Sequence, residues 1–457
     1  MLFNSYGFIF VFLPVVLAGY FRITNCTLSS LWLLVSSLIF YGMLSVNYLP
    51  VLIVSVCMNY FVSRRIESGH AKKIWLMLGI VFNFIMLGYF KFTGTLPPGI
   101  SFFTFTQTAY IVCVFKGSAK TESFMKYAEY ASFFPYVISG PISDYRDIMP
   151  QLKDESKRII NYDNLASGMT LFILGLFKKV YIADGLAPAV NTLFANSGGL
   201  TFFEAWFAAL SYSMQLYFDF SGYSDMAIAA ALMMNINLPV NFDSPYKSLS
   251  IIDFWRRWHI TLGKWIRDYV YIPLGGSREG EVKKIRNVII AMLFTGLWHG
   301  VGFTFILWGL IHGLMIAVNH QWRRLNIKIP ALLSWFITFM CVVLCWVVFR
   351  AESVEDAINI IAAMFDVRNI VLPYKFMKYL GFLEAYGIQF GKLVNNNAAE
   401  KVPYLVLFII ASLFAWNTQK IMTRFKPYII CVVIIFVIAA ISMMNFSGIS
   451  DFLYFQF

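Results

Sequence analysis

Apolar segments long enough to cross a lipid bilayer recur along the entire chain. About 20 apolar residues in a helix span the hydrocarbon core, and five runs approach or exceed that length: Trp75–Phe92, Phe203–Phe220, Val288–Leu310, Ala331–Phe349 and Ile429–Met444. Only 13% of the 457 residues are charged, about half the share usual in soluble domains. We therefore predict an all-α polytopic membrane protein, a single membrane-embedded domain over residues 1–457 with about ten to twelve transmembrane helices.

Positive charge indicates how the chain is oriented. The net charge is +12, and cations cluster in short loops between apolar runs, at Arg64/Arg65, Lys72/Lys73, Lys283/Lys284/Arg286 and Arg323/Arg324. The positive-inside rule places these loops in the cytoplasm. Because the basic residues are dispersed at helix ends and form no recognisable binding module, we expect no nucleic-acid partner. Met1–Tyr20 lacks the early Lys or Arg of a signal peptide, so we expect it to be retained.

Four segments depart from a simple spanning pattern. Residues 96–107 begin with Leu-Pro-Pro-Gly and then run apolar, which predicts a re-entrant segment or a broken helix shielded from lipid. Residues 239–287 are too polar to span, and we expect an interfacial or cytoplasmic helical segment. Residues 366–401 predict an extramembrane loop, and residues 451–457 form a C-terminal aromatic motif.

The GLWHG sequence places His299 between glycines inside an apolar run. A polar side chain at membrane depth usually marks a function or a protein-lined cavity. The alternative is a buried histidine satisfied by one backbone carbonyl. Glycines on both sides permit close approach of either a substrate or a neighbouring helix, so they do not decide between the two.

A second histidine lies in a basic and aromatic segment, FWRRWHITLGKWIRDYVY. Read as one helix, Ile251–Val270 places Trp255, Trp258 and His259 on one face. The flanking cations can bind the phosphates of coenzyme A or anionic lipid headgroups, and His259 can orient the donor or carry protons beside His299. The predicted donor-binding residues are Arg256, Arg257, Lys264, Arg267, Trp255 and Trp258.

Two carboxylates stand in the apolar sequence QLYFDFSGYSDMAIA. Alternate polar positions from Asp219 to Asp225 resemble the opening of a calcium loop, but the required Gly is Ser224 and the closing Glu is Ala230. As a helix, Asp219 shares a face with Tyr223, which favours a supporting role that orients histidines or arginines, with helix packing as the alternative.

Other polar residues give weaker signals. His312 can line the same cavity as His299 or serve packing, whereas His320 beside Trp322 indicates a membrane boundary. No HExxH-type spacing supports zinc binding by the histidines, and the six cysteines contain no CxxC pair. We predict no bound metal or cofactor. Tyr454 in the terminal FLYFQF is either part of an interfacial aromatic belt or a hydroxyl that accepts an acyl group.

Together, the segments GISFFTF, SGPISDYRD, LYFDFSGYSDMAIA, FWRRWHITLGKWIRDYVYIPLGGSR, GLWHG and FLYFQF resemble the membrane-bound O-acyltransferase family, in its bacterial alginate and peptidoglycan O-acetyltransferase branch. The resemblance implies that His299 is the catalytic histidine and His259 a second functional histidine, both held in a central funnel or tunnel. It further implies that cytoplasmic acetyl-CoA is the donor. Cys113 stands where family members often carry an aspartate, which cautions against assuming identical donor contacts.

The resemblance also implies a pathway for the acyl group. Tyr454 would relay acetyl to an extracytoplasmic partner of esterase fold, which would O-acetylate a polysaccharide at the bacterial cytoplasmic (inner) membrane. We lean towards peptidoglycan, with alginate or another exopolysaccharide as alternatives. The other functions considered are a D-alanyl transferase for teichoic acid, a secondary transporter of an acyl precursor, and a structural membrane scaffold. The transporter is disfavoured because no internal repeat is visible.

Overall fold

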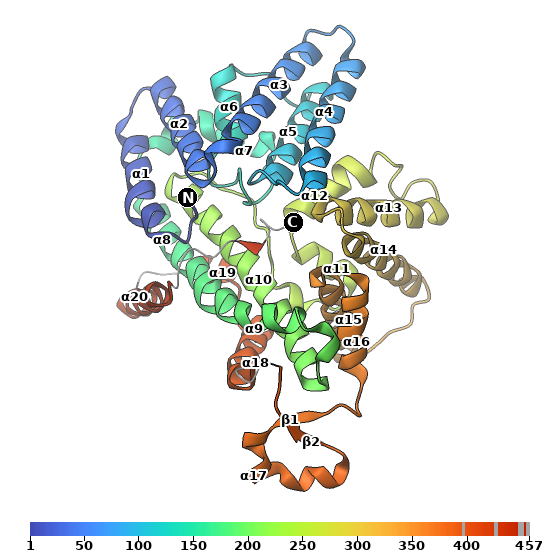
Figure 1. The fold of residues 1–457 in the computed structure, drawn as a ribbon. Coiled ribbons are helices and arrows are strands. Elements are labelled where there is room, and N and C mark those ends of the chain that lie inside the picture. Colours follow the sequence, from blue (N-terminus) through green and yellow to red (C-terminus); the bar gives the residue numbers. More distant parts are fainter. Residues whose placement is uncertain (395–397, 425–427, 447–451, 454–457) are drawn as a thin grey trace.

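The protein is almost entirely helical (Figure 1). The computed structural model describes residues 1–394, 398–424, 428–446 and 452–453. Three π-helical turns, η1 (Phe8–Phe12), η4 (Lys178–Ala183) and η7 (Arg267–Tyr271), interrupt the α-helical pattern. The α-helices are α1 (Leu13–Arg22), α2 (Cys26–Leu44), α3 (Leu49–Glu67), α4 (Lys72–Thr93), α5 (Ile100–Phe115), α6 (Phe124–Ser132), α7 (Tyr145–Lys153), α8 (Tyr162–Phe177), α9 (Asp184–Phe194), α10 (Phe202–Met233), α11 (Ile251–Arg257), α12 (Ile260–Ile266), α13 (Glu281–His299), α14 (Phe303–Arg324), α15 (Ala331–Arg350), α16 (Val354–Phe365), α17 (Met377–Leu380), α18 (Ala398–Phe414), α19 (Thr418–Met422) and α20 (Ile429–Met444).

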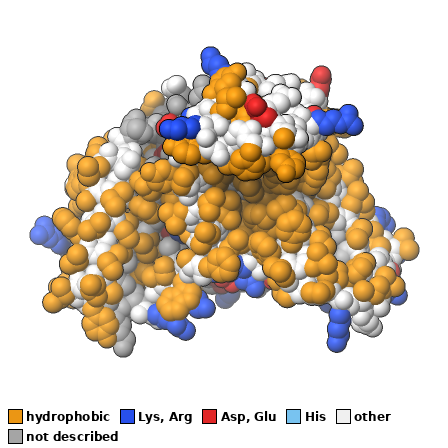
Figure 2. All heavy atoms as spheres, turned by 90° about the horizontal axis from the view of Figure 1, so that it is seen from below, with side chains coloured by type: hydrophobic (Ala, Val, Ile, Leu, Met, Phe, Trp, Pro, Cys, Tyr) orange, Lys and Arg blue, Asp and Glu red, His pale blue; other side chains and the backbone are white. Residues whose placement is uncertain are grey.

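The predicted class, an all-α polytopic membrane protein, is confirmed. Within the described residues, six helical stretches are long and apolar enough to span a bilayer, and three shorter apolar helices accompany them. Hydrophobic side chains cover most of the face shown in Figure 2, and Lys and Arg side chains lie mainly at its margins. The six stretches are Cys26–Leu44, Val46–Glu67, Lys72–Thr93, Tyr162–Phe194, Phe303–Arg324 and Ala331–Arg350, and the shorter three are Phe8–Arg22, Ile100–Phe115 and Ile429–Met444.

The long helix α10 crosses the middle of the molecule beside α8 (Figure 1). Its start is fixed by a capping box, in which Thr201 and Glu204 each satisfy a backbone N–H of the other. Gly222 lets α10 approach α8 closely, because a Cβ there would lie 2.6 Å from the carbonyl oxygen of Gly175. Nearly every side chain of α10 is buried, so its carboxylates point into protein and not into lipid.

The Pro-Pro-Gly sequence forms a turn that leads into α5. Gly99 has a positive φ of 73°, and a Cβ there would lie 2.3 Å from the carbonyl oxygen of Val137. Beyond the turn, α5 is a continuous helix whose side chains are almost all buried. The expected shielding of this segment is therefore provided by the surrounding helices.

The apolar run Val288–Leu310 is not one helix, contrary to the prediction. It is split at Gly300–Gly302, so that α13 ends at His299 and α14 turns back against it (Figure 1). Glycines bring the two helices into close contact, because a Cβ on Gly296 would lie 2.3 Å from the carbonyl oxygen of Phe305. The GLWHG glycines thus allow a neighbouring helix to approach closely.

The two polar segments are structured. Residues 239–287 contain α11, α12 and η7 in place of one long helix. Within residues 366–401, a parallel pair of short strands, β1 (Val371–Pro373) and β2 (Gln389–Gly391), brackets short helical turns that include α17.

Gly296→Ala is expected to destabilise the protein by about 1–3 kcal/mol, because the added methyl group clashes with backbone that cannot move aside. Thermal unfolding in detergent, followed by tryptophan fluorescence, measures the change. Gly185→Ala on α9 is the matched control, since a Cβ there meets no atom within 4 Å. Equal melting temperatures for the two variants would contradict the account of α13–α14 packing.

Candidate active site

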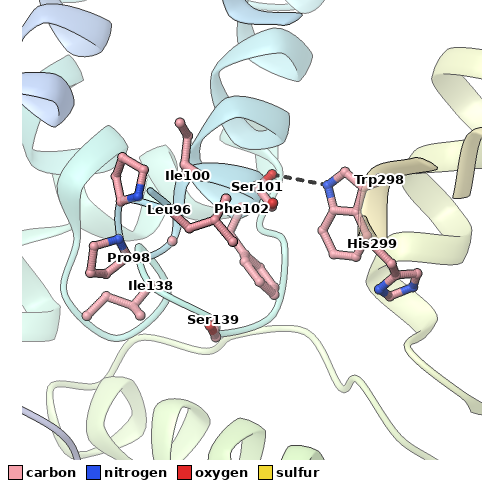
Figure 3. Close-up of a pocket in the computed structure, with 11 residues that line it drawn as sticks. Leu96, Pro98, Ile100, Ser101, Phe102, Ile138, Ser139, Trp298 and His299 are labelled. Atoms are coloured by element: carbon pink, nitrogen blue, oxygen red, sulfur yellow. Dashed lines mark hydrogen bonds between the residues drawn. The ribbon is translucent and has the colours of Figure 1, made fainter. Parts of the chain in front are cut away.

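His299 is the last residue of α13 and is only 3% exposed. Aromatic rings enclose it, with centroids 5.3 Å away at Trp308 and 5.1 Å away at Phe349. His299 and Trp298 border a pocket whose opposite wall is the Pro-Pro-Gly turn and the start of α5 (Figure 3). The histidine therefore lies at the edge of a cavity, in an otherwise apolar environment.

His259 occupies a break between α11 and α12. Its φ of +45° is a left-handed conformation that is uncommon for a residue with a side chain. The break corrects the prediction of a continuous Ile251–Val270 helix: the chain turns at Trp258 and His259, so Trp255 and Trp258 do not share one face with the histidine. His259 is completely buried.

Asn241 fixes the orientation of His259. The Oδ1 atom of Asn241 lies 3.1 Å from Nδ1 of His259 and accepts hydrogen bonds from the hydroxyl and the backbone N–H of Thr261. Since a backbone N–H can only donate, this atom is the amide oxygen, and Nδ1 of His259 must donate to it. The neutral ring then carries its basic lone pair on Nε2.

The two histidines converge on Trp298. The ring centroid of Trp298 lies 5.9 Å from that of His259 and 4.8 Å from that of His299. Its indole N–H points the other way and donates to the carbonyl oxygen of Ser101, at 3.4 Å (Figure 3). The structure thus brings together the two residues that the sequence singled out, 40 positions apart.

Lys91 is a buried polar residue of the site that the sequence analysis missed. It lies near the end of α4, is 8% exposed, and donates from Nζ to the backbone carbonyl of His299 at 2.9 Å. A lysine inside the apolar sequence LGYFKFT was the available signal. Its partner is 208 residues away in the chain, and no local pattern indicates that contact.

Four cations line a cavity of about 760 Å³ between the α11–α12–η7 segment and α13, which we call the cationic pocket. Its inner wall includes Thr295, one helical turn before His299, so the pocket ends close to the histidine. The pocket size suits a small-molecule ligand. The cations are Arg256, Lys264, Arg267 and Lys284, and Trp255 also lines the wall.

Two predicted donor-binding residues lie elsewhere. Arg257 forms ion pairs with Asp253, at 3.0 Å, and with Asp243, at 3.8 Å, and is not part of the cationic pocket. Trp258 is buried between aromatic rings, 4.8 Å from Trp346 by ring centroid. Both residues lie at the end of α11, before the break at His259, and neither lines the cationic pocket.

The predicted supporting residues separate into two groups. His312 is fully buried on α14 and accepts a hydrogen bond at Nδ1 from the indole N–H of Trp255, at 3.2 Å. Asp219 and Asp225 instead pair with lysines of η4, and Tyr223 stacks on Phe452 at 4.5 Å. Among the described residues no cluster of His, Cys, Asp and Glu is arranged to hold a metal ion. Tyr454 lies outside the described residues.

Comparisons with known proteins show the family of the chain. Residues 74–351, which contain both histidines, match the model of MBOAT, the membrane-bound O-acyltransferase family. The chain is 39% identical to a peptidoglycan O-acetyltransferase of Helicobacter pylori, over 92% of this chain and 90% of the relative. It is 38% identical to a probable alginate O-acetylase of Pseudomonas aeruginosa, over 84% of this chain and 82% of the relative. It is 30% identical to a teichoic acid D-alanyltransferase of Streptococcus thermophilus, over 50% of this chain and 57% of the relative.

The helical fold and these matches define a multi-pass membrane enzyme that transfers acyl groups. The chain belongs to the membrane-bound O-acyltransferase family.

Asn241→Leu is expected to lower kcat for acyl transfer about a hundredfold with little change in KM, because His259 loses the partner that orients it. Asn241→Asp keeps an acceptor at the same place and should retain more activity. Steady-state kinetics of the purified variants, with melting temperatures to verify folding, tests this. Full activity of a folded Asn241→Leu protein would exclude an orienting role.

Proposed function

We propose that this protein takes acetyl from cytoplasmic acetyl-CoA and passes it through the membrane for O-acetylation of a cell-envelope polysaccharide. The similarity over most of the chain to a peptidoglycan O-acetyltransferase and a probable alginate O-acetylase supports acetyl as the group transferred. Peptidoglycan is the preferred acceptor because that relative is 39% identical to this chain, against 38% for the alginate relative, and alginate or another exopolysaccharide is the alternative. D-alanyl transfer is less favoured, since that relative covers only 50% of this chain.

The observation that carries the proposal is the junction between the cationic pocket and the two histidines. Guanidinium and ammonium groups suit the phosphates of coenzyme A, and the pocket that they line ends one helical turn from His299. A thioester bound with its phosphates among Arg256, Lys264 and Arg267 would point its acyl end inwards. Shielding by Trp298, Trp308 and Phe349 would keep water from hydrolysing it.

The helix directions support transfer across the membrane. Helices α4 and α13 each have two lysines in their first turns, at Lys72/Lys73 and Lys283/Lys284, and the positive-inside rule assigns those ends to the cytoplasm. Their opposite ends meet where Lys91 donates to the His299 carbonyl. The pocket beside His299 and the Pro-Pro-Gly turn therefore lies toward the far side from the basic loops.

The proposed chemistry is acyl transfer with His299 as general base and His259 beside it as a proton carrier. His299 accepts the proton of an attacking hydroxyl, whose oxygen forms a bond to the thioester carbonyl carbon. The carbon–sulfur bond breaks, and the proton passes to the sulfur of coenzyme A. General base catalysis of this kind contributes about 10²–10⁴ in rate. The hydroxyl is that of Tyr454, and an extracytoplasmic partner of esterase fold then transfers acetyl from the tyrosine to the polysaccharide. The location is the bacterial inner membrane.

Radiolabelled acetyl-CoA is expected to label the purified wild-type protein, whereas His299→Ala removes the base and Tyr454→Phe removes the accepting hydroxyl, so neither variant is labelled. Scintillation counting after denaturation measures the covalent label. His70→Ala, at an exposed position between α3 and α4 that lies outside the cationic pocket, serves as the control and should label normally. Equal labelling of wild type and Tyr454→Phe would exclude this tyrosine, and labelling of His299→Ala would exclude the base.

The double substitution Lys264→Ala/Arg267→Ala is expected to raise KM for acetyl-CoA at least tenfold, because each charge-assisted hydrogen bond to phosphate contributes about 1.5–3 kcal/mol. The effect on kcat should be small. Raising the salt concentration should weaken donor binding more in wild type than in the double variant. Arg257→Ala is the matched control, since this arginine is paired with Asp253 and lies outside the pocket. A KM unchanged by the double substitution would place the donor elsewhere.

A further inference from the structure

Two buried ion pairs join α10 to the π-helical turn η4. Asp219 Oδ1 lies 2.7 Å from Lys179 Nζ, and Asp225 Oδ2 lies 2.7 Å from Lys178 Nζ. The carboxylates are only 1% and 6% exposed. Both ion pairs connect α10 to η4, and their aspartates are six residues apart on α10. The two ion pairs are therefore close structural equivalents. They differ in what else each carboxylate binds.

The remaining oxygen of Asp219 binds the C-terminal segment. Asp219 Oδ2 accepts the backbone N–H of Leu453 at 3.1 Å, across 234 residues of sequence. Asp225 instead accepts hydrogen bonds from the side chains of Thr418 and Gln419 on α19. Lys179 has a second partner in Asp184, at 2.8 Å, which helps to hold its ammonium group in place.

Aromatic contacts hold the neighbouring residue of the C-terminal segment. The ring of Phe452 stacks on Tyr223, one turn along α10 from Asp219, with centroids 4.5 Å apart and planes 24° apart. It also contacts Phe220, at 5.5 Å. Phe452 is 1% exposed and Leu453 is 8% exposed, so these two residues are packed in the interior.

The same contacts lead to the histidines. Phe220 packs edge-on against the ring of His259, with centroids 4.7 Å apart. A single phenylalanine therefore touches both Phe452 and His259. Tyr454 follows Leu453 by one peptide bond, so the segment that Asp219 holds is directly connected to the tyrosine assigned to the relay.

We propose that Asp219, supported by Lys179, is the receptor for Phe452 and Leu453, and that acyl transfer to Tyr454, the next residue in the chain, depends on this anchoring. This proposal rests on the proposed function for its role in transfer, but the binding itself does not depend on it. Recognition uses the main-chain N–H of Leu453 and one carboxylate oxygen of Asp219. The stacking of Phe452 on Tyr223 determines which N–H of the segment reaches that oxygen. Asp219 is a positioning residue, and it does not touch the reacting atoms.

Carboxypeptidase digestion measures whether Phe452 and Leu453 are held, when the release of these two residues from the protein is followed. When opening is fast, digestion follows the small population of released segment. Asp219→Leu removes a charge-assisted hydrogen bond, so the digestion rate should rise about ten- to hundredfold. Asp219→Asn keeps an oxygen acceptor, so its digestion rate should rise less. Asp225→Leu breaks the equivalent ion pair without touching the segment and should leave the rate near that of wild type.

Acetyl labelling of the same samples separates this proposal from the proposed function. Faster digestion together with slower labelling in Asp219→Leu, but not in Asp225→Leu, supports the receptor role. If no sample is labelled while the digestion rates still differ, the relay fails and the receptor stands. Equal digestion of Asp219→Leu and Asp225→Leu, whether fast or slow, overturns the receptor and reduces Asp219 to an ordinary structural ion pair.

Discussion

The structure depends on how it accommodates polar backbone at membrane depth. Every peptide group in lipid must be hydrogen-bonded, so a helix can be broken only where protein encloses the break. This chain is broken at Trp258–His259 and at Gly300–Gly302, and a histidine stands at each break. Asn241 binds the side chain and the backbone around the first break, and Lys91 caps a carbonyl at the second. The catalytic candidates are therefore located where continuous helix is absent. His259 stands at an enclosed break, whereas His299 is the buried residue before a turn in which Val301 and Gly302 are exposed.

Enclosure also explains the aromatic character of the site. Trp298, Trp308 and Phe349 surround His299 without offering it a competing charge. Large rings fill space with few rotatable bonds, so the cavity keeps its shape. Charged groups near the site include Lys91 at the His299 carbonyl and the cationic pocket along α13, while the lysine–aspartate pairs join α10 to η4.

The sequence allowed the class, the loop charges and His299 to be predicted, because bilayer length and an isolated intramembrane histidine are local signals. It did not predict the break at His259, since a positive φ at a residue with a side chain follows from tertiary contacts such as those of Asn241. Arg257 and Trp258 lie outside the cationic pocket, although they are adjacent in sequence to Arg256, which lines it. Lys91 was visible as a charge in an apolar run, but its contact with His299 depends on the packing of helices far apart in sequence.

The close packing of α13 on α14 has a mechanical consequence for the cationic pocket. One wall of the pocket is α13, clamped backbone to backbone onto α14 through Gly296 and Gly309, so these two helices can move only as one stiff body. The opposite wall consists of two seven-residue helices and a π-helical turn. Such short pieces joined at a bend can hinge at little cost. Any widening of the pocket for a bulky ligand therefore moves the wall that carries His259, while His299 stays fixed.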